Sequence, residues 1–346
     1  MRPHAIASFA APLAAATLAA CGSAQGKSTA TARPPDSTPV GASAASTPSA
    51  AVKPCGSAGA ETLARTAGVV ARRIYANELA SSEVFSDKRQ VEGFSPLLSA
   101  LQSGNRAAVK EAVTSLFFSH THVVRLRVTR GGEVLADVGG PEILAPVGGS
   151  LRRGGRTLGH YLLSVQDDLG YVKLVSRFIC VPPALRAGSR TLPVAGALAP
   201  GPASIPAHGP VDYRGATYQA FSFGAQAFPS GPLRISLLLP TSSSLARRSC
   251  SEIRVSELGD VARRVSRRFA LSPASFPSYI GATAPLIGGL IYIRSGSRQL
   301  AGSTRPGPRT LPDQGTVDYR GATYGVSSFT ATTAAGQARI YLLVHP

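Results

Sequence analysis

The chain has 346 residues, with 36 Lys+Arg against 18 Asp+Glu and a net charge of +18. This length is sufficient for two domains. Arginine supplies most of the positive charge, and it comes without a lysine-rich arm or a basic strand with interleaved aromatic residues, which argues against nucleic acid as a partner. The sequence also lacks an apolar run of the ~18 residues that a membrane-spanning helix needs.

The N-terminus carries an export signal. Arg2 gives a short positive region, and the apolar stretch 5–20 is short and rich in alanine, as in a cleavable leader. The stretch ends in Leu18-Ala19-Ala20-Cys21, which resembles the lipobox of bacterial lipoproteins. The resemblance implies that residues 1–20 are the signal peptide and that Cys21 carries the lipid. It places the protein on the extracytoplasmic face of the cell membrane, held there by a palmitate-type anchor.

Residues 21–54 predict a linker. They are rich in Ala, Ser, Thr, Gly and Pro and contain no aromatic side chain, so they cannot bury enough apolar surface to fold. As a flexible coil, about thirty such residues reach ~30 Å. The linker can therefore hold a folded part clear of the lipid headgroups.

Three cysteines remain after Cys21, namely Cys55, Cys180 and Cys250. Outside the cytoplasm two of them can oxidise to a disulfide, and the sequence leaves all three pairings open. A Cys55–Cys250 bridge is attractive because each residue stands shortly before an arginine-bearing helical pattern. No two of the three lie close together in the sequence as zinc ligands usually do, so we expect no metal site.

Amphipathic helices follow Cys55 and Cys250. Leu63, Ala67, Val70 and Ile74 recur at helical spacing, which predicts one buried stripe. Shorter helical patterns cover 96–102 and 105–118, the second beginning at an Asn N-cap. A comparable stripe runs through 255–265. The tetrapeptides 71–74 and 262–265, Ala-Arg-Arg-Ile and Ala-Arg-Arg-Val, suggest that the first and last of these helices are related.

The region 123–165 predicts β-structure. Residues 123–129 alternate, and Arg130-Gly131-Gly132-Glu133 turns the chain into a second strand over 134–138. Segments 143–147 and 158–165 then form a second ribbon across the turn at 148–155. If Arg130 faces Glu133, Asp137 falls on the core-side face, where a carboxylate needs a partner or a ligand. A register slip of one residue would instead turn Asp137 to solvent.

This order of elements resembles the extracytoplasmic Cache and PAS-like sensor domains of bacteria. Pro146-Val147 and the apolar strand 159–165 carry the resemblance, which covers about residues 57–178. It implies a pocket for a small molecule or anion on one sheet face, without a cofactor. The candidate ligand-binding residues are Arg125, Arg127, Asp137, Tyr161 and Asp167. Asp167-Asp168 also fits the cap of a helix over 169–178.

An internal repeat organises the rest of the chain. Val-Asp-Tyr-Arg-Gly-Ala-Thr-Tyr stands at 211–218 and again at 317–324. Each copy reads as strand, tight turn and strand, so the recurring Asp, Arg and Tyr belong to a hairpin turn rather than to a site. We expect an α+β fold with antiparallel sheets and N-terminal amphipathic helices. A Cache/PAS-like lobe over 55–240 contains the first copy, and a smaller related lobe over 241–346 contains the second.

These patterns favour a lipid-anchored binding or sensing accessory protein without catalysis. A signalling role would need a membrane partner. One alternative is a structural envelope protein whose arginines contact anionic wall polymers or lipid headgroups. Another is a hydrolase using Ser164 or Ser222 with His160 or His208. Neither serine stands in a Gly-x-Ser-x-Gly turn, so the hydrolase is the weaker alternative.

Overall fold

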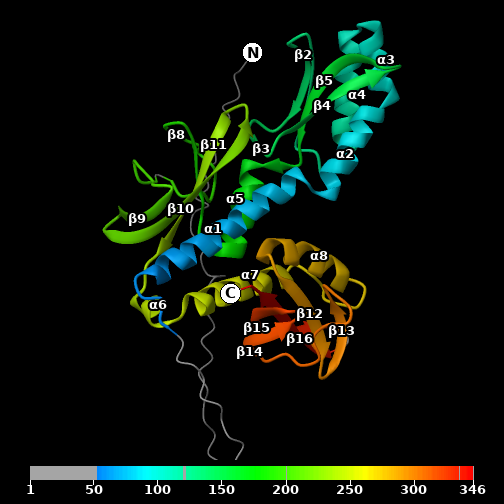
Figure 1. Cartoon of the computed structure of the whole chain (residues 1–346). Coiled ribbons are helices and arrows are strands. Elements are labelled where there is room, and N and C mark those ends of the chain that lie inside the picture. The colour runs from blue at the N-terminus through cyan, green and yellow to red at the C-terminus, as the bar shows by residue number, and fades with distance from the viewer. Residues whose placement is uncertain (1–52, 120–121, 200, 335, 346) are drawn as a thin grey trace, which may run out of the picture. The chain divides into compact units, whose positions relative to one another are not determined.

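The computed structural model describes residues 53–119, 122–199, 201–334 and 336–345 (Figure 1). The predicted signal peptide, Cys21 and nearly all of the linker lie outside these residues. Within the described ranges, no helix combines the length and the apolar character needed to cross a membrane.

The helices form largely where the sequence predicts them, and α2, α6 and α8 are additions. The predicted stripe on α1 is buried at Ala67, Val70 and Ile74. Asn105 caps α4, because its Oδ1 accepts a hydrogen bond from the Ala108 amide at 3.0 Å. The helices are α1 (Ala58–Leu79), α2 (Ser82–Gly93), α3 (Ser95–Ser103), α4 (Arg106–Ser119), α5 (Asp168–Ile179), α6 (Ser243–Arg247), α7 (Cys250–Ser266) and α8 (Phe276–Ile287).

The strands form three antiparallel sheets. The first sheet has the order β2-β1-β5-β4, the second β6-β3-β10-β11-β7-β8 with β9 beside β10, and the third β13-β12-β16-β15-β14. Up to residue 191 the strands are β1 (Arg125–Arg130), β2 (Glu133–Gly139), β3 (Ile143–Leu144), β4 (Val147–Arg153), β5 (Arg156–Ser164), β6 (Gln166–Asp167), β7 (Ala184–Ala187) and β8 (Arg190–Thr191). The others are β9 (His208–Tyr213), β10 (Ala216–Phe228), β11 (Gly231–Pro240), β12 (Leu290–Ser295), β13 (Arg298–Gly302), β14 (Gln314–Tyr319), β15 (Ala322–Thr333) and β16 (Gly336–Val344).

The prediction of a strand over 143–147 followed by a turn over 148–155 is wrong, because β4 (Val147–Arg153) covers most of the predicted turn. Ala145 has a positive φ of 50°, which interrupts an extended strand. Ile143 and Leu144 before it pair with β10 in the second sheet, while β4 begins after it and pairs with β5 in the first. One short segment therefore links two sheets.

The two copies of the repeat fold alike. The first copy forms β8-β7-β11-β10-β9 and the second forms β13-β12-β16-β15-β14, so each has its strands in the order second, first, fifth, fourth, third. Each copy also has two helices, α1 and α5 in the first and α7 and α8 in the second. The helices α2–α4 and the first sheet are inserted between α1 and α5. The prediction of an α+β fold with antiparallel sheets and a related second lobe is confirmed.

Equivalent arginines hold equivalent loops in the two copies. Arg186 of β7 donates to the carbonyls of Pro202 at 3.2 Å and Ala203 at 2.9 Å. Arg294 of β12 donates to the carbonyls of Pro308 and Arg309. Both loops contain a Pro-Gly-Pro sequence, at 200–202 and at 306–308. In each copy one guanidinium therefore satisfies carbonyls that have no strand partner.

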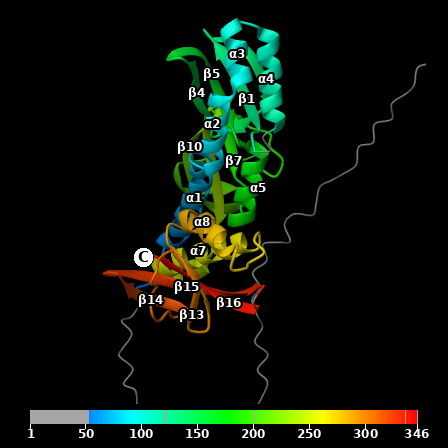
Figure 2. The ribbon, with the colours of Figure 1, turned by 90° about the vertical axis from the view of Figure 1, so that its right-hand side faces the viewer.

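One hydrophobic core joins the copies. It contains Val70 of α1 and Leu237 of β11 together with Val261 of α7 and Ile340 of β16. Helix α1 contacts α7 and α8 as well as β10 and β11, and both views show α1 close to α7 and α8 (Figures 1 and 2). The first sheet has a separate core with α3 and α4. The boundary at 240/241 separates the copies in sequence and stays a prediction as a division between domains.

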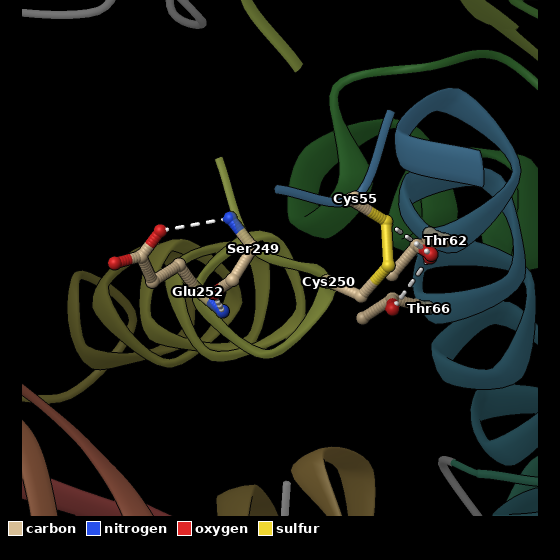
Figure 3. The surroundings of a disulfide bond; sticks show 6 residues. All are labelled: Cys55, Thr62, Thr66, Ser249, Cys250 and Glu252. Carbon is tan, nitrogen blue, oxygen red and sulfur yellow. Dashed lines mark hydrogen bonds between the residues drawn. A yellow bond between two sulfur atoms is a disulfide. The ribbon is translucent and has the colours of Figure 1, made fainter. Parts of the chain in front are cut away.

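A disulfide joins the N-terminal ends of α1 and α7 (Figure 3). Of the three pairings that the sequence leaves open, Cys55–Cys250 is present, with a Cα–Cα distance of 4.9 Å. Cys180 is the left-handed C-cap of α5, with φ 61°. Helix α7 begins at Cys250 because Ser249 and Glu252 form a capping box, which satisfies two backbone amides at the start of the helix.

Equivalent glycines let each long helix lie against its sheet. A Cβ atom on Gly68 of α1 would stand 2.0 Å from the Phe221 ring of β10, and one on Gly259 of α7 would stand 2.6 Å from Ser327 of β15. Phe221 and Ser327 occupy the same position of the repeat, counted from the shared Tyr218 and Tyr324. The absence of a side chain at each glycine therefore sets how closely helix and sheet approach.

We expect Gly68→Ala to destabilise the protein by about 1–3 kcal/mol, because the added methyl group overpacks the contact with Phe221. Gly281→Ala is the matched control. A Cβ there has no neighbour within 4 Å, so the higher helix propensity of alanine should stabilise α8 by about 0.5–1 kcal/mol. Urea denaturation measures both changes, and equal midpoints for the two variants would contradict the close approach of α1 to β10.

Candidate functional site

The structure brings three of the five predicted ligand-binding residues together. Arg125 and Asp137 form a bidentate pair, with both nitrogen–oxygen distances 2.8 Å. Arg125 Nη1 also donates to the carbonyls of Gly140 and Pro141. The guanidinium groups of Arg125 and Arg127 lie over the ring of Phe228, 4.6 and 5.0 Å from its centroid. This cluster attaches the first sheet to the end of β10.

The prediction that Asp137 lies on the core-side face is wrong. The turn has the expected register, with Arg130 opposite Glu133, but a bulge between Val128 and Thr129 shifts the pairing by one residue. Asp137 therefore lies opposite Arg127, on the face of the arginines. A slip of one residue exchanges the two faces of a strand, and the carboxylate finds Arg125 as its partner there.

Tyr161 and Asp167 lie elsewhere. Tyr161 is buried on the core side, where its hydroxyl donates to Glu92 of α2 at 2.6 Å. The same face is filled by leucines and valines of α3 and α4. Asp167 caps α5, because its Oδ1 accepts a hydrogen bond from the Gly170 amide at 2.5 Å. The five residues do not surround one site.

The repeated octapeptides form hairpin turns, as predicted. Arg214 and Gly215 both have positive φ, 50° and 76°, as do Arg320 and Gly321 in the second copy. This is the conformation of the turn that fits the twist of two antiparallel strands. In each copy the Asp accepts a hydrogen bond from the Thr hydroxyl across the hairpin. The recurring polar residues serve the turn.

Each of the two serines considered for hydrolysis donates a hydrogen bond to a backbone carbonyl. Ser164 Oγ donates to the carbonyl of Leu144 at 2.5 Å, and Ser222 Oγ donates to the carbonyl of Pro206 at 2.9 Å. His160 contacts Ser150, and His208 contacts the ring of Phe221. In the part of the chain that the structure describes, no three side chains of the metal-ligating types gather.

A different site arises where the copies meet. Helices α1 and α7 align through the tetrapeptides 71–74 and 262–265. Helices α5 and α8 align through their ends, because each ends before a left-handed residue, Cys180 with φ 61° and Gly288 with φ 64°. These pairs of helices pack together in the shared core.

The contacts between the copies are reciprocal. Arg73 of α1 donates to the Leu286 carbonyl near the end of α8 at 3.0 Å. Arg264 of α7 donates to the Phe178 carbonyl near the end of α5 at 2.8 Å. A cation is favourable at a helix C-terminus. Two equivalent residues that each contact the equivalent place on the other side are typical of a twofold interface, here within one chain.

A hollow of about 400 Å³ lies between α1, α5, α7 and α8. Its lining residues come in equivalent pairs from the two copies. The pairs are Ile74 and Val265, Asn77 and Arg268, Glu78 and Phe269, Leu174 and Ala282, and Phe178 and Leu286. The hollow therefore belongs to the approximate twofold arrangement, and its walls are mostly apolar.

The polar groups of the hollow differ between its two sides. Glu78 is next to the last residue of α1, where the helix dipole disfavours a negative charge. Burial raises the pKa of the Glu78 carboxyl to about 6, and the Glu83 carboxylate contributes to the rise. None of the ion pairs among the described residues involves Glu78. Arg268 is exposed, with its guanidinium over the ring of Phe178.

The sequence analysis did not identify this site. A signal was present, because Glu78 follows Ile74 by four residues and so lies on the same face of α1 as the buried stripe. A carboxylate on a buried face needs a partner or a ligand. The other lining residues come from helices far apart in the sequence, and only the fold brings them together.

Comparisons with known proteins found no matching family model and no matching curated protein. Two solved structures are similar at low identity. The periplasmic domain of Vibrio cholerae LuxQ is 13% identical, covering 51% of this chain and 99% of that chain, with a TM-score of 0.35. The ligand-binding domain of the Pseudomonas fluorescens chemoreceptor CtaA, solved with L-alanine, is 12% identical, covering 52% and 96%, with a TM-score of 0.30. Values this low support no statement about what this chain binds.

We expect Glu78→Gln to raise the melting temperature at pH 7.5. The folded-state pKa of about 6 lies above the ordinary value of 4.5, so ionisation destabilises the folded chain and the penalty is complete above pH 6. At pH 5 the carboxyl is mostly protonated and the difference should shrink. Glu83→Gln is the control with the opposite sign, because backbone hydrogen bonding lowers the pKa of Glu83. A Glu78→Gln variant that melts no higher than the parent at pH 7.5 would contradict burial as the cause.

Proposed function

We propose that this chain is a lipid-anchored extracytoplasmic binding protein without a catalytic site, and that it binds a small organic ammonium in the hollow between the two copies. The observation that carries the proposal is the Glu78 carboxylate, which is half-buried, stands at the unfavourable end of a helix and takes part in none of the described ion pairs. A buried carboxylate costs free energy unless it is paired. A bound ammonium group supplies the missing charge.

The residues that line the hollow fit an organic ammonium ligand. The apolar walls, from Ile74, Leu174, Phe178 and Val265 among others, accept a hydrocarbon substituent, as in most small-molecule pockets. Asn77 adds an amide beside the carboxylate. Because the walls come from both copies, a ligand there would contact α1, α5, α7 and α8 together, so binding would oppose separation of the copies.

A thermal-shift series with three matched probes tests the proposal. We expect hexylammonium to raise the melting temperature at pH 7.5, because a ligand that binds only the folded state stabilises it by about 2.7 kcal/mol at a hundred times its Kd. Hexan-1-ol and hexanoate should have much smaller effects. The shift should vanish in Glu78→Gln, persist in Glu83→Gln and weaken at pH 5, where Glu78 is protonated.

Two outcomes of this series would reject the proposed ammonium site. If hexanoate raised the melting temperature more than hexylammonium, the hollow would be an anion site governed by Arg268. An equal response of the parent and Glu78→Gln to hexylammonium would also reject the proposal, because binding would then not involve the carboxylate.

The lipid anchor is a separate part of the proposal, and the Leu18–Cys21 motif supports it. We expect mass spectrometry of the mature protein to find Cys21 as the N-terminal residue with a diacylglyceryl group. Cys21→Ser should move the protein from the membrane fraction to the soluble one, because the buried acyl chains are lost. A mature chain that begins elsewhere, or a Cys21 engaged in a disulfide, would contradict the anchor.

A further inference from the structure

The two equivalent arginines at the interface have different surroundings. Glu257 of α7 lies seven residues before Arg264, and its Oε1 is 3.7 Å from Arg264 Nη1. On α1 the equivalent residue, seven before Arg73, is Thr66. The first copy therefore lacks the carboxyl group that lies beside the arginine in the second.

The charges near Arg73 do not replace that carboxylate. Arg73 lines a cleft of about 460 Å³ between α1 and α7, together with Arg65 and Arg254. Glu61, the acidic residue among the described residues that line this cleft, is half-exposed and already forms an ion pair with Arg65. Burial lowers the pKa of Arg73, and the positive charges of Arg254 and Arg72 lower it further. Among the described residues that line the cleft, three are arginines and one is a glutamate.

We propose that this cleft binds a small carboxylate ligand, whose carboxylate takes the place at Arg73 that the Glu257 side chain takes at Arg264. Arg65 can add a second positive contact, and the hydroxyl groups of Thr62 and Ser251 also line the cleft. Arginine suits this role because its planar group can bind both oxygens of a carboxylate. The site is separate from the hollow at Glu78 and takes a ligand of the opposite charge, so it does not depend on the proposed function.

Arg73 also has a structural role that needs no ligand, because it donates to the Leu286 carbonyl. The second copy shows that the two roles are compatible. Arg264 donates to the Phe178 carbonyl and is paired with Glu257 at the same time. A ligand carboxylate at Arg73 would complete the same arrangement.

The first test introduces a carboxylate beside Arg73 by substitution. Thr66→Glu places an acid where the second copy has Glu257, and Thr66→Gln is the uncharged control of nearly the same size. We expect Thr66→Glu to melt at a higher temperature than Thr66→Gln at pH 7.5, and its affinity for succinate to fall at least tenfold from that of the parent. If Thr66→Glu melted no higher than Thr66→Gln, Arg73 would not lack a counter-charge and the proposal would fail.

The second test measures the ligand directly. Calorimetric titration of the full chain with succinate, at fixed ionic strength, should give binding that the neutral analogue succinamide does not. Arg73→Gln should weaken it at least tenfold and Arg65→Gln several-fold. Arg72→Gln should change it less than twofold, because Arg72 is exposed and does not line the cleft.

Two results would overturn the site. One is equal binding of succinate and succinamide. The other is equal loss of succinate binding in Arg72→Gln and Arg73→Gln, which would indicate a general response to net charge. If Arg73→Gln proved too unstable to titrate, Arg65→Gln would decide, because Arg65 is exposed and its replacement leaves the contact with Leu286 intact.

Discussion

The packing of α1 against α7 is the contact on which the rest of the structure depends. Each helix lies on the sheet of its own copy through a glycine, Gly68 or Gly259, and each caps a helix of the other copy through an arginine. The Cys55–Cys250 disulfide fixes the start of the pair, and the shared hydrophobic core surrounds it. Both proposed sites are bounded by these two helices, so both depend on their close approach.

Several arginines of this chain have a structural role that the net charge of the chain does not indicate. Several guanidinium groups donate to backbone carbonyls that no strand or helix satisfies, and a buried carbonyl without a partner is costly. The residues concerned are Arg73, Arg125, Arg130, Arg186, Arg264 and Arg294. These arginines therefore stabilise the fold whether or not they also bind an anion.

The features that could be predicted from the sequence are those that depend on a local pattern of residues. The helical stripes, the cap at Asn105, the hairpin turns at Arg214 and Arg320 and the relation between the helices at 71–74 and 262–265 all follow from spacing over a few residues. Asp137 was misplaced because a bulge, which no local pattern announced, shifted the strand by one residue. The hollow at Glu78 could not be predicted, because its walls come from four helices that are separated by the inserted first sheet and by the strands of the first copy.

The covalent connection between the copies has a consequence for how they can differ. In a homodimer every substitution at a twofold axis occurs on both subunits, so an acid facing the axis meets its own copy. In a tandem duplication this constraint is absent, because a substitution in one half does not occur in the other. Glu78 can then stand across from Phe269, and Thr66 can correspond to Glu257. Joining two halves in one polypeptide thus allows a single asymmetric molecule to be recognised at a place whose backbone geometry is nearly symmetric.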